Sequence, residues 1–535
     1  MKIQDISFSD LTFSTLFCHY TSDFKKVKEF YSADPFSDEG YKQSFSRKTF
    51  NGNRDELVED LKSFNAPFRL EEAAVENIEA LRKNDTLTVA TGQQMAIYGG
   101  PIFTVFKTIT TIFLAKRLSA TTGKKVVPVF WLADEDHDFE EISGIKLPIG
   151  SEIKDIKLPP RENGPSVGRI DISDSLPEFR EQVYQLLPDT DFKDELMNLL
   201  DDAYESGNLK TGFARLLSSL FSKHGLIFAG SDFIPFKQRL IEPLQNAIIN
   251  ADSIHDVLDR QSSLIGAKYH QQAQIQGTTL FLHTEKHGRV RLNNLDEKWS
   301  SEDGQQWDKQ EILNLAQNHP ELFSPNVFLR PILQDCLLPN IAYVGGPAEI
   351  AYYGQMSTVY PMFGIDMPVI LPRLSATLVE TSIERIMNQL PFNPFDYKAR
   401  IEDLDKAYID KIEYGEVDQI FSDWKDEIKN IGDEYIQYIS EFDASLKGSA
   451  GKETANYCKS IDKLQQKLKR TIKQKEETQL NRIRKIRQHL FPNGVLQERE
   501  VSILHFMNKY GINIWDQILD NLESPYNEKH KLIFF

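Results

Sequence analysis

An acidic segment, Asp134-Glu-Asp-His-Asp138, comes directly after the apolar residues 126–133. Several carboxylates beside one imidazole could hold Mg²⁺, bind a substrate ammonium group or transfer protons, because His137 titrates near neutral pH. A zinc hydrolase would need more histidine ligands close to His137 than this segment offers. Exposed charge runs are usually solvated loops, so the sequence leaves the functional and the solvated-loop interpretations open.

A second group of candidates combines Thr91-Gly-Gln-Gln94 with Gly99-Gly-Pro101. In an open α/β sheet, ligands bind beyond the carboxyl ends of the strands, where the free N–H groups of a helix N-terminus attract an anion. Neither GxGxxG nor GxxxxGK[ST] occurs, which excludes the standard dinucleotide fingerprint and the P-loop. The glycines could also serve tight turns alone, and their spacing does not decide between the two.

A third group consists of Arg330 and the segment Gly345-Gly-Pro-Ala-Glu349. An arginine after an apolar run could hold a carboxylate or phosphate with two hydrogen bonds, or it could form a buried structural ion pair. The apolar surroundings of Cys336 favour an inert core thiol over a nucleophile. No GxSxG, HExxH or kinase motif supports a serine hydrolase, a zincin or a kinase.

The elements that would position these residues alternate between strands and helices. Apolar residues from Ile102 to Phe113 recur on one helix face after Pro101, which suits the first helical position. A strand, this helix and a second strand within one short stretch predict an open parallel sheet. Buried strands are expected at 86–90, 126–133, 226–230, 326–331, 341–344 and 369–374, a turn at 91–94, a helix at 348–359 and a hairpin at 278–283 and 289–292.

The chain becomes helical from about residue 400. A heptad-like seam predicts one long helix, which breaks at residues 448–451 before a second helix continues to residue 490. The first helix is net acidic and the second net basic, which favours an antiparallel coiled-coil hairpin over a nucleic-acid contact by the basic residues. The seam consists of Tyr414, Val417, Phe421, Trp424, Ile428, Ile431, Tyr435, Tyr438 and Phe442.

Composition narrows the classes of protein further. The chain of 535 residues suggests three or four structural units, and its net charge of −17 argues against broad binding to nucleic acid or anionic membranes. Its three cysteines form no CxxC pair, which makes a disulfide framework or a cysteine-rich zinc site improbable. Residues 95–118 are too polar for a membrane span, and residues 1–10 do not resemble a secretory signal. We therefore expect a cytoplasmic protein.

Four segments together resemble the bacillithiol-biosynthesis cysteine-adding enzyme family, also called cysteine ligases. They are TGQQMAIYGGPIFTVFKTITTIFLAKRL, VPVFWLADEDHDFEEI, FLRPILQDCLLPNIAYVGGPAEIAYYGQM and FPNGVLQERE, in family order between about residues 86 and 500. The resemblance implies an α/β, Rossmann-like core like that of nucleotidylyltransferases and class I aminoacyl-tRNA synthetases, with a coiled-coil domain that dimerises. The expected parts are an N-terminal segment (1–85), the core (86–390) with insertions at about 145–225 and 235–320, a coiled-coil hairpin (400–492) and a C-terminal segment (493–535).

The resemblance implies a ligase that joins the carboxyl group of L-cysteine to the amine of glucosaminyl-malate, the last step to bacillithiol. ATP with Mg²⁺ would activate the carboxyl group. No HIGH-like or KMSKS-like signature occurs, so activation as an adenylate or as an acyl phosphate stays open. The candidate residues are His137 and Asp136 for catalysis, Asp134, Asp138, Gln93, Gln94, Arg330, Arg373 and Glu349 for substrates, and Thr91, Gly92, Gly99, Gly100, Gly345 and Gly346 for nucleotide, with no dedicated metal ligands.

Two other functions fit the same residues. A coiled-coil scaffold on a degenerate nucleotide-binding core would bind a ligand without turning it over. A metal-dependent hydrolase would use the acids of residues 134–141.

Overall fold

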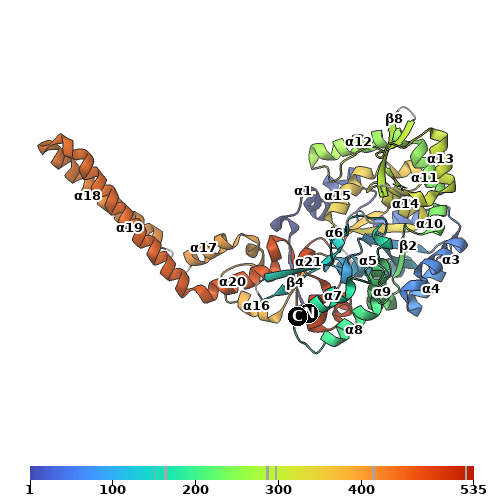
Figure 1. Ribbon diagram of the computed structural model, residues 1–535, viewed down its shortest axis with the longest axis horizontal. Coiled ribbons are helices and arrows are strands. Elements are labelled where there is room, and N and C mark those ends of the chain that lie inside the picture. Colours follow the sequence, from blue (N-terminus) through green and yellow to red (C-terminus); the bar gives the residue numbers. More distant parts are fainter. Residues whose placement is uncertain (151, 162–165, 285–287, 296–297, 412–415, 525–526) are drawn as a thin grey trace. The chain divides into compact units, whose positions relative to one another are not determined.

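The computed structural model describes the chain except residues 151, 162–165, 285–287, 296–297, 412–415 and 525–526. The chain forms two compact units (Figure 1). Unit 1 comprises Met1–Thr377 and Glu498–Ile533, and unit 2 comprises Leu378–Gln497 and Phe534–Phe535.

A five-stranded parallel sheet forms the centre of unit 1, in the order β13-β12-β2-β3-β6. If the five strands are numbered 1 to 5 along the chain and read from β6, their order is 3-2-1-4-5. This is the order of the first five of the six strands of a Rossmann sheet. The expected parallel, Rossmann-like core is therefore confirmed. Its strands are β2 (Leu87–Gln93), β3 (Val126–Leu132), β6 (Ile227–Gly230), β12 (Asn340–Gly345) and β13 (Val369–Pro372).

Helix α5 (Phe103–Thr122) connects β2 to β3 and is buried along most of its length. Three of its four buried threonine hydroxyls donate to carbonyls one turn earlier, as Thr108 does to Thr104 at 3.0 Å. These bonds satisfy the hydroxyls, so the helix can be buried without unpaired donors at those positions. Leu114 and Leu118 then pack with the sheet residues of the core cluster.

The N-terminal segment covers the sheet and closes one of its edges. Tyr41 joins the core cluster. At the edge strand β6, the Asn65 side chain donates to the Phe228 carbonyl at 2.8 Å and accepts from the Phe228 N–H at 3.0 Å. The Asn65 side chain thus pairs backbone groups of β6 that would otherwise be unpaired at the edge of the sheet. The segment contains β1 (Lys2–Ile6), α1 (Thr15–Ser22), α2 (Asp38–Arg47), α3 (Arg54–Asn65) and α4 (Glu72–Ala80).

Two insertions interrupt the core after β3 and after β6. The first holds α6 (Phe139–Ile142), β4 (Gly144–Ile149), β5 (Glu152–Lys157), α7 (Leu176–Leu186), α8 (Lys193–Ala203) and α9 (Leu209–Phe221). The second holds α10 (Ile234–Arg239), α11 (Ile241–Ile249), α12 (Ala251–Lys268), α13 (Lys309–Asn318), α14 (Leu329–Leu337) and the strands β7 (Leu280–Thr284), β8 (Gly288–Leu295), β9 (Lys298–Ser301), β10 (Gln306–Trp307) and β11 (Phe323–Pro325). The antiparallel pairing of β7 with β8 confirms the expected hairpin.

Two local expectations are wrong. Residues 91–94 are not a turn: β2 continues to Gln93, because β3 supplies pairing partners as far as Leu132. Residues 326–331 are not a strand, because the Asn326 side chain accepts from the N–H groups of Phe328 and Leu329 and starts helix α14. Arg330 therefore lies in the first turn of a helix.

The remaining elements of unit 1 follow β12 or lie near the C-terminus of the chain. Helix α15 (Pro347–Met356) begins directly after β12, in place of the expected 348–359. The others are α22 (Ile503–Tyr510), α23 (Ile514–Asn521) and β15 (His530–Phe534), with α21 (Gln497–Glu500) and β14 (Ala376–Val379) at the limits of the unit.

Unit 2 contains the expected helical hairpin, in which α18 (Val417–Phe442) and α19 (Lys447–Lys475) lie side by side (Figure 1). The break lies at residues 443–446, where the Asp443 side chain accepts from the Ser445 N–H, and the expected break at 448–451 is wrong because Gly448 and Gly451 are inside α19. The other helices of the unit are α16 (Thr381–Met387), α17 (Ile401–Lys411) and α20 (Glu477–Leu490), which follows α19 after one residue.

Opposite charges pair across the hairpin, as Lys469 does with Asp418 and Lys425 with Asp462. Phe421 is buried, but Trp424, Tyr435 and Tyr438 are exposed because two helices cannot enclose a wide apolar seam. Tyr414 lies outside the described residues. Within the described ranges, no helix is both long and apolar enough to cross a membrane.

Candidate functional site

A cavity of about 550 Å³ lies at the carboxyl ends of the strands of the parallel sheet, and we call it the strand-end cavity. Each of the five strands, or the residues directly after it, contributes to its wall. It is thus placed where open α/β sheets bind their ligands. The contributing residues are Gly92, Gln93 and Gln94 at the end of β2, Trp131, Ala133, Glu135 and Asp136 at the end of β3 or after it, Ser231 after β6, Tyr343 and Gly346 in β12 and after it, and Arg373 after β13.

Gly92 leaves space at the floor of the cavity. A Cβ atom at this position would lie 3.2 Å from the Tyr343 hydroxyl and 3.4 Å from Cβ of Trp131. A side chain here would therefore press on two residues of the wall.

Lys107 on α5 fixes the end of β2 from beneath. Its Nζ donates to the Gly92 carbonyl at 2.7 Å and to Oε1 of Gln93 at 2.9 Å, and it pairs with Glu349 at 2.5 Å. The side chain is only 3% exposed, and burial lowers the pKa of Lys107 from its ordinary value. Three acceptors around one ammonium satisfy this buried charge.

Glu349 in the first turn of α15 is the partner of Lys107. It also accepts from the Tyr343 hydroxyl at 2.6 Å and from the Gly346 N–H at 2.7 Å. Burial raises the pKa of Glu349, but Lys107 and the Gly346 N–H outweigh it, so that the pKa lies below the ordinary value. The ionised carboxylate caps α15 and joins it to β2 through Lys107.

Several acidic side chains line the cavity. Glu135 is 8% exposed and pairs with Lys237, while its Oε2 atom is buried without a hydrogen-bond partner among the described residues. Oδ2 of Asp136 accepts from the Gln94 side chain at 2.7 Å, and the same amide group donates to Glu141 at 2.9 Å. Gln94 therefore holds two carboxylates side by side.

Three arginines that line the cavity have no carboxylate within ion-pair distance in the described part of the chain: Arg289, Arg330 and Arg499. Arg289 donates to the Ser324 hydroxyl at 2.9 Å, and burial lowers its pKa from the ordinary value. Arg330 contacts Gln334 at 3.2 Å and the Tyr352 hydroxyl at 3.4 Å, both neutral groups. Their positive charge is left for an anionic ligand.

The structure brings eight of the candidate residues to the strand-end cavity. They are Gly92, Gln93, Gln94, Asp136, Arg330, Gly346, Glu349 and Arg373. Of these, Arg373 is already paired with Glu498 at 2.6 Å, with both side chains almost fully buried, so it holds the wall together. Thr91, Gly99, Gly100, Asp134, His137, Asp138 and Gly345 do not line this cavity.

Asp134 and Asp138 support the backbone. Oδ1 of Asp134 accepts from the N–H groups of Ser231 and Asp232 at 2.9 and 3.0 Å, and Lys210 lies 3.4 Å from Oδ2. Burial raises the pKa of Asp134. Asp138 caps α6 by accepting from the Glu141 N–H at 3.1 Å. Among the described residues, no three His, Cys, Asp or Glu side chains are grouped to hold a metal, so this segment gives the hydrolase hypothesis no ligand set.

His137 lies beside the cavity wall, where it stacks on His283 of β7 with ring centroids 5.4 Å apart. Burial lowers the pKa of His137 and lowers the pKa of His283 to about 4. Both imidazoles are therefore neutral at pH 7.

A smaller hollow of about 360 Å³ shares Gln93, Gln94 and Arg499 with the strand-end cavity. Gly100 lines it, so Gln93 and Gly100 share a hollow that His137 does not reach. Gly99 and Gly100 have φ angles of 82° and 66°, and a Cβ atom on Gly99 would lie 2.4 Å from Ile503. The turn thus requires these glycines whether or not a ligand binds.

The remaining nucleotide candidates have structural partners. The Thr91 hydroxyl is buried and donates to the Val344 carbonyl at 2.8 Å, which ties β2 to β12. Gly345 ends β12 and pairs with Pro372 of β13.

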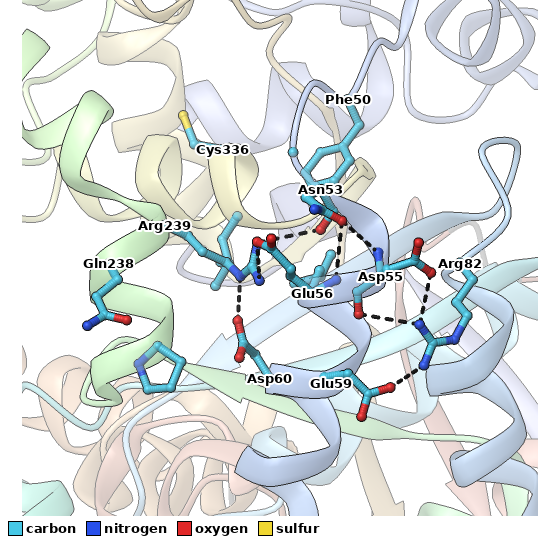
Figure 2. A pocket seen from close by; sticks show the side chains of 14 residues that line it. Phe50, Asn53, Asp55, Glu56, Glu59, Asp60, Arg82, Gln238, Arg239 and Cys336 are labelled. Atoms are coloured by element: carbon cyan, nitrogen blue, oxygen red, sulfur yellow. Dashed lines mark hydrogen bonds and ion pairs between the residues drawn. The ribbon is translucent and has the colours of Figure 1, made fainter.

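A hollow of about 700 Å³ elsewhere in unit 1 is a poorer candidate (Figure 2). Its acidic side chains are paired with arginines: Arg82 contacts Asp55 and Glu59, and Arg239 contacts Asp60 and Glu56. Cys336 lines it, but burial raises the pKa of the thiol to about 12, so it is a poor nucleophile. The charges of this hollow are already matched within the protein.

Sequence reasoning missed Lys107, Glu135, Arg289 and Arg499. Lys107 could have been found, because a lysine within an apolar helix face indicates a buried ion pair. Arg499 lies in the segment FPNGVLQERE, which the family resemblance had already marked. Arg289 comes from the second insertion, and no local pattern links β8 to the sheet.

Known proteins match the chain over nearly its whole length. The family model described as bacillithiol biosynthesis BshC, N-terminal Rossmann-like domain, matches residues 1–374, and the model of the BshC C-terminal coiled-coil domain matches residues 376–535. A "putative cysteine ligase BshC" from Salinibacter ruber is 32% identical over 95% of this chain and 94% of its own. The protein of that name from Chlorobaculum tepidum is 31% identical over 97% of both chains.

A solved structure described as a putative arginyl-tRNA synthetase from Campylobacter jejuni covers 89% of this chain and all of its own, but at 10% identity and a TM-score of 0.25 the likeness carries no argument. The domain descriptions of the two family models agree with the parallel sheet and with the helical hairpin. The chain belongs to the BshC family of bacillithiol biosynthesis.

Proposed function

We propose that this protein is a ligase that uses ATP to join the carboxyl group of L-cysteine to the amine of glucosaminyl-malate. The names of the relatives support a cysteine ligase. The observation that carries the proposal is the strand-end cavity, which is lined both by carboxylates and by arginines that have no carboxylate partner among the described residues. Such a cavity suits an ammonium group beside anionic groups, which is what these substrates bring together.

The arginines suit the anionic parts of the substrates. Arg330 and Arg289 would bind the malyl carboxylates or the phosphates of the nucleotide, because guanidinium groups form paired hydrogen bonds with both. Gly346 already donates its N–H to Glu349, so we assign phosphate binding to the arginines in preference to this turn. Mg²⁺ would arrive with ATP and keep most of its water ligands, so it needs no protein cage.

The proton that leaves the attacking amine needs an acceptor. In the proposed step, the amine nitrogen bonds to the activated carboxyl carbon, the bond to the phosphate oxygen breaks, and the amine loses one proton. Asp136 lines the cavity, so it is the better candidate for accepting this proton. His137 is neutral but does not line the cavity. We therefore propose Asp136 as the base and His137 as a residue that packs behind it.

The test is incubation of the protein with L-cysteine, ATP and glucosaminyl-malate, followed by mass spectrometry. We expect bacillithiol together with AMP or ADP, and the nucleotide product identifies adenylate or acyl-phosphate activation. Arg330→Gln should lower kcat/KM for glucosaminyl-malate by roughly tenfold or more, as expected for the loss of a charged hydrogen-bonding partner. The matched control is Arg260→Gln, a change at an exposed arginine of α12.

Absence of product from the wild-type protein would contradict the ligase. Cells that carry Asp136→Ala with unchanged bacillithiol would favour the scaffold instead.

We also propose that the protein is a homodimer through the coiled-coil hairpin and acts in the cytoplasm. The exposed aromatic residues of α18 support a dimer, because large exposed apolar patches mark interaction sites. The three cysteines are free thiols, which suits a reducing compartment.

A further inference from the structure

Two residues that line the strand-end cavity each carry a buried polar atom that has no hydrogen-bond partner among the described residues. One is Oε2 of Glu135, whose residue is 8% exposed, and the other is Nε1 of Trp131, whose residue is 1% exposed. Both residues line the cavity. Buried polar groups are normally paired, so an unpaired acceptor and an unpaired donor on two lining residues of one cavity indicate a ligand that supplies both partners.

The chemistry of the two atoms restricts the ligand. Oε2 belongs to a carboxylate and accepts hydrogen bonds, while the indole N–H can only donate. We propose that Glu135 and Trp131 bind the head group of the amino-acid substrate: Glu135 accepts from its ammonium group, and Trp131 donates to its carboxyl oxygen. The identity of that amino acid as cysteine rests on the proposed function.

Glu135 is the acid in residues 134–138 that lines the cavity with a buried oxygen lacking a hydrogen-bond partner among the described residues. The oxygens of Asp134 are occupied by backbone N–H groups and Lys210, and Asp138 caps α6. Both oxygens of Asp136 accept hydrogen bonds, one from Gln94 and one from the His137 N–H. We therefore propose Glu135, in preference to Asp134, Asp136 or Asp138, as the partner of the ammonium group.

Lys237 orients Glu135 from the opposite side. Its ammonium group, 4% exposed, pairs with Oε1 of Glu135 and donates to the Phe323 carbonyl of β11. One oxygen of Glu135 is therefore held by Lys237 of α10, which leaves the other oxygen available to a ligand. Lys237 is a positioning residue in this arrangement.

A carboxylate suits the α-ammonium group of cysteine better than it suits the amine of glucosaminyl-malate. It stabilises a protonated amine and so raises its pKa. The amine of glucosaminyl-malate must lose a proton before it attacks, whereas the α-ammonium group of cysteine takes no part in amide formation. Glu135 therefore matches the amine that stays charged.

Ligands that lack one charged group test the proposal. The affinities of L-cysteine, 3-mercaptopropionate (no ammonium group) and cysteamine (no carboxyl group) are measured by calorimetry on the full chain. We expect the wild type to bind cysteine roughly tenfold or more tightly than 3-mercaptopropionate, and Glu135→Gln to reduce that preference below roughly threefold. Trp131→Phe should lower the affinities for cysteine and for 3-mercaptopropionate by a similar factor. The affinity for cysteamine should stay unchanged.

Controls separate binding from folding. Glu135→Gln leaves Lys237 unpaired, so the double variant E135Q/K237M removes both charges and should show the same loss of preference. Asp60→Asn breaks the ion pair with Arg239 outside the cavity and should bind all three ligands as the wild type does.

The outcomes are distinct. An undiminished preference for cysteine in both Glu135 variants would overturn the subsite and leave the ligase proposal standing. Binding of serine in place of cysteine, with the same dependence on Glu135, would support the subsite and overturn cysteine as the substrate. A wild type that binds no amino acid, with or without ATP, would overturn both.

Discussion

At the scale of single residues, the ion pair between Lys107 and Glu349 couples β2 to α15 beneath the cavity. Lys107→Met leaves a buried carboxylate with no counter-ion, so we expect the free energy of unfolding to fall by about 3–5 kcal/mol. Chemical denaturation measures this change. The double variant K107M/E349Q should recover part of the loss, and a decrease below about 1 kcal/mol in the single variant would contradict the role of the pair.

His530 gives stability a pH dependence of definite sign. It lies buried between the hydroxyls of Ser375 and Thr377, each 2.9 Å from a ring nitrogen, and burial lowers its pKa to about 4. The unfolded chain, with a histidine pKa near 6.5, binds the proton more readily. The stability is therefore complete above about pH 6.5 and falls by roughly 3 kcal/mol as the pH drops to 4.

Unfolding midpoints measured at several pH values between 4 and 7 test this dependence. His530→Gln should flatten the decline, whereas the same change at exposed His255 should not. An equal slope in the wild type and in His530→Gln would exclude this histidine as the cause.

At the scale of elements, the hairpin offers a test of where its second helix begins. Gly448 lies inside α19, and a Cβ atom there would meet nothing within 4 Å. Gly448→Ala should therefore stabilise the start of α19 by about 0.5–1 kcal/mol. Hydrogen exchange on the full chain should show slower exchange of the α19 amides, and faster exchange would mean that this segment is a turn.

The elements also show what sequence patterns can predict. Buried strands such as residues 126–133 were predictable because their apolar runs are continuous, and the seam of α18 because its period is regular. The helix at Arg330 was missed because Asn326 caps it, and capping outweighs an apolar run. Gln93, Gln94 and Asp136 were found because strand ends converge in a parallel sheet. The unpaired oxygen of Glu135 depends on Lys237, about 100 residues away, and no local pattern reveals it.

At the scale of the whole molecule, the proposed dimer depends on exposed side chains of the hairpin. Tyr435, Tyr438 and Phe442 are 60%, 58% and 77% exposed, so changing all three to serine should not unfold α18. We expect light scattering to give twice the chain mass of 61.5 kDa for the wild type and the single mass for the variant. Serine at exposed Val75 and Ile249 is the control, and a triple variant that stays dimeric would refute the interface.

The Asn65 side chain that closes the edge of β6 has a consequence for biosynthesis. Asn65 leaves the ribosome 163 residues before Phe228, the partner of its amide group. At about 5–20 residues per second, the N-terminal helices wait on the order of 10–30 s for that strand. During this interval the edge strand that α3 contacts does not yet exist, so part of the apolar face of α3 stays uncovered. Nascent chains of this protein should therefore be clients of ribosome-bound chaperones.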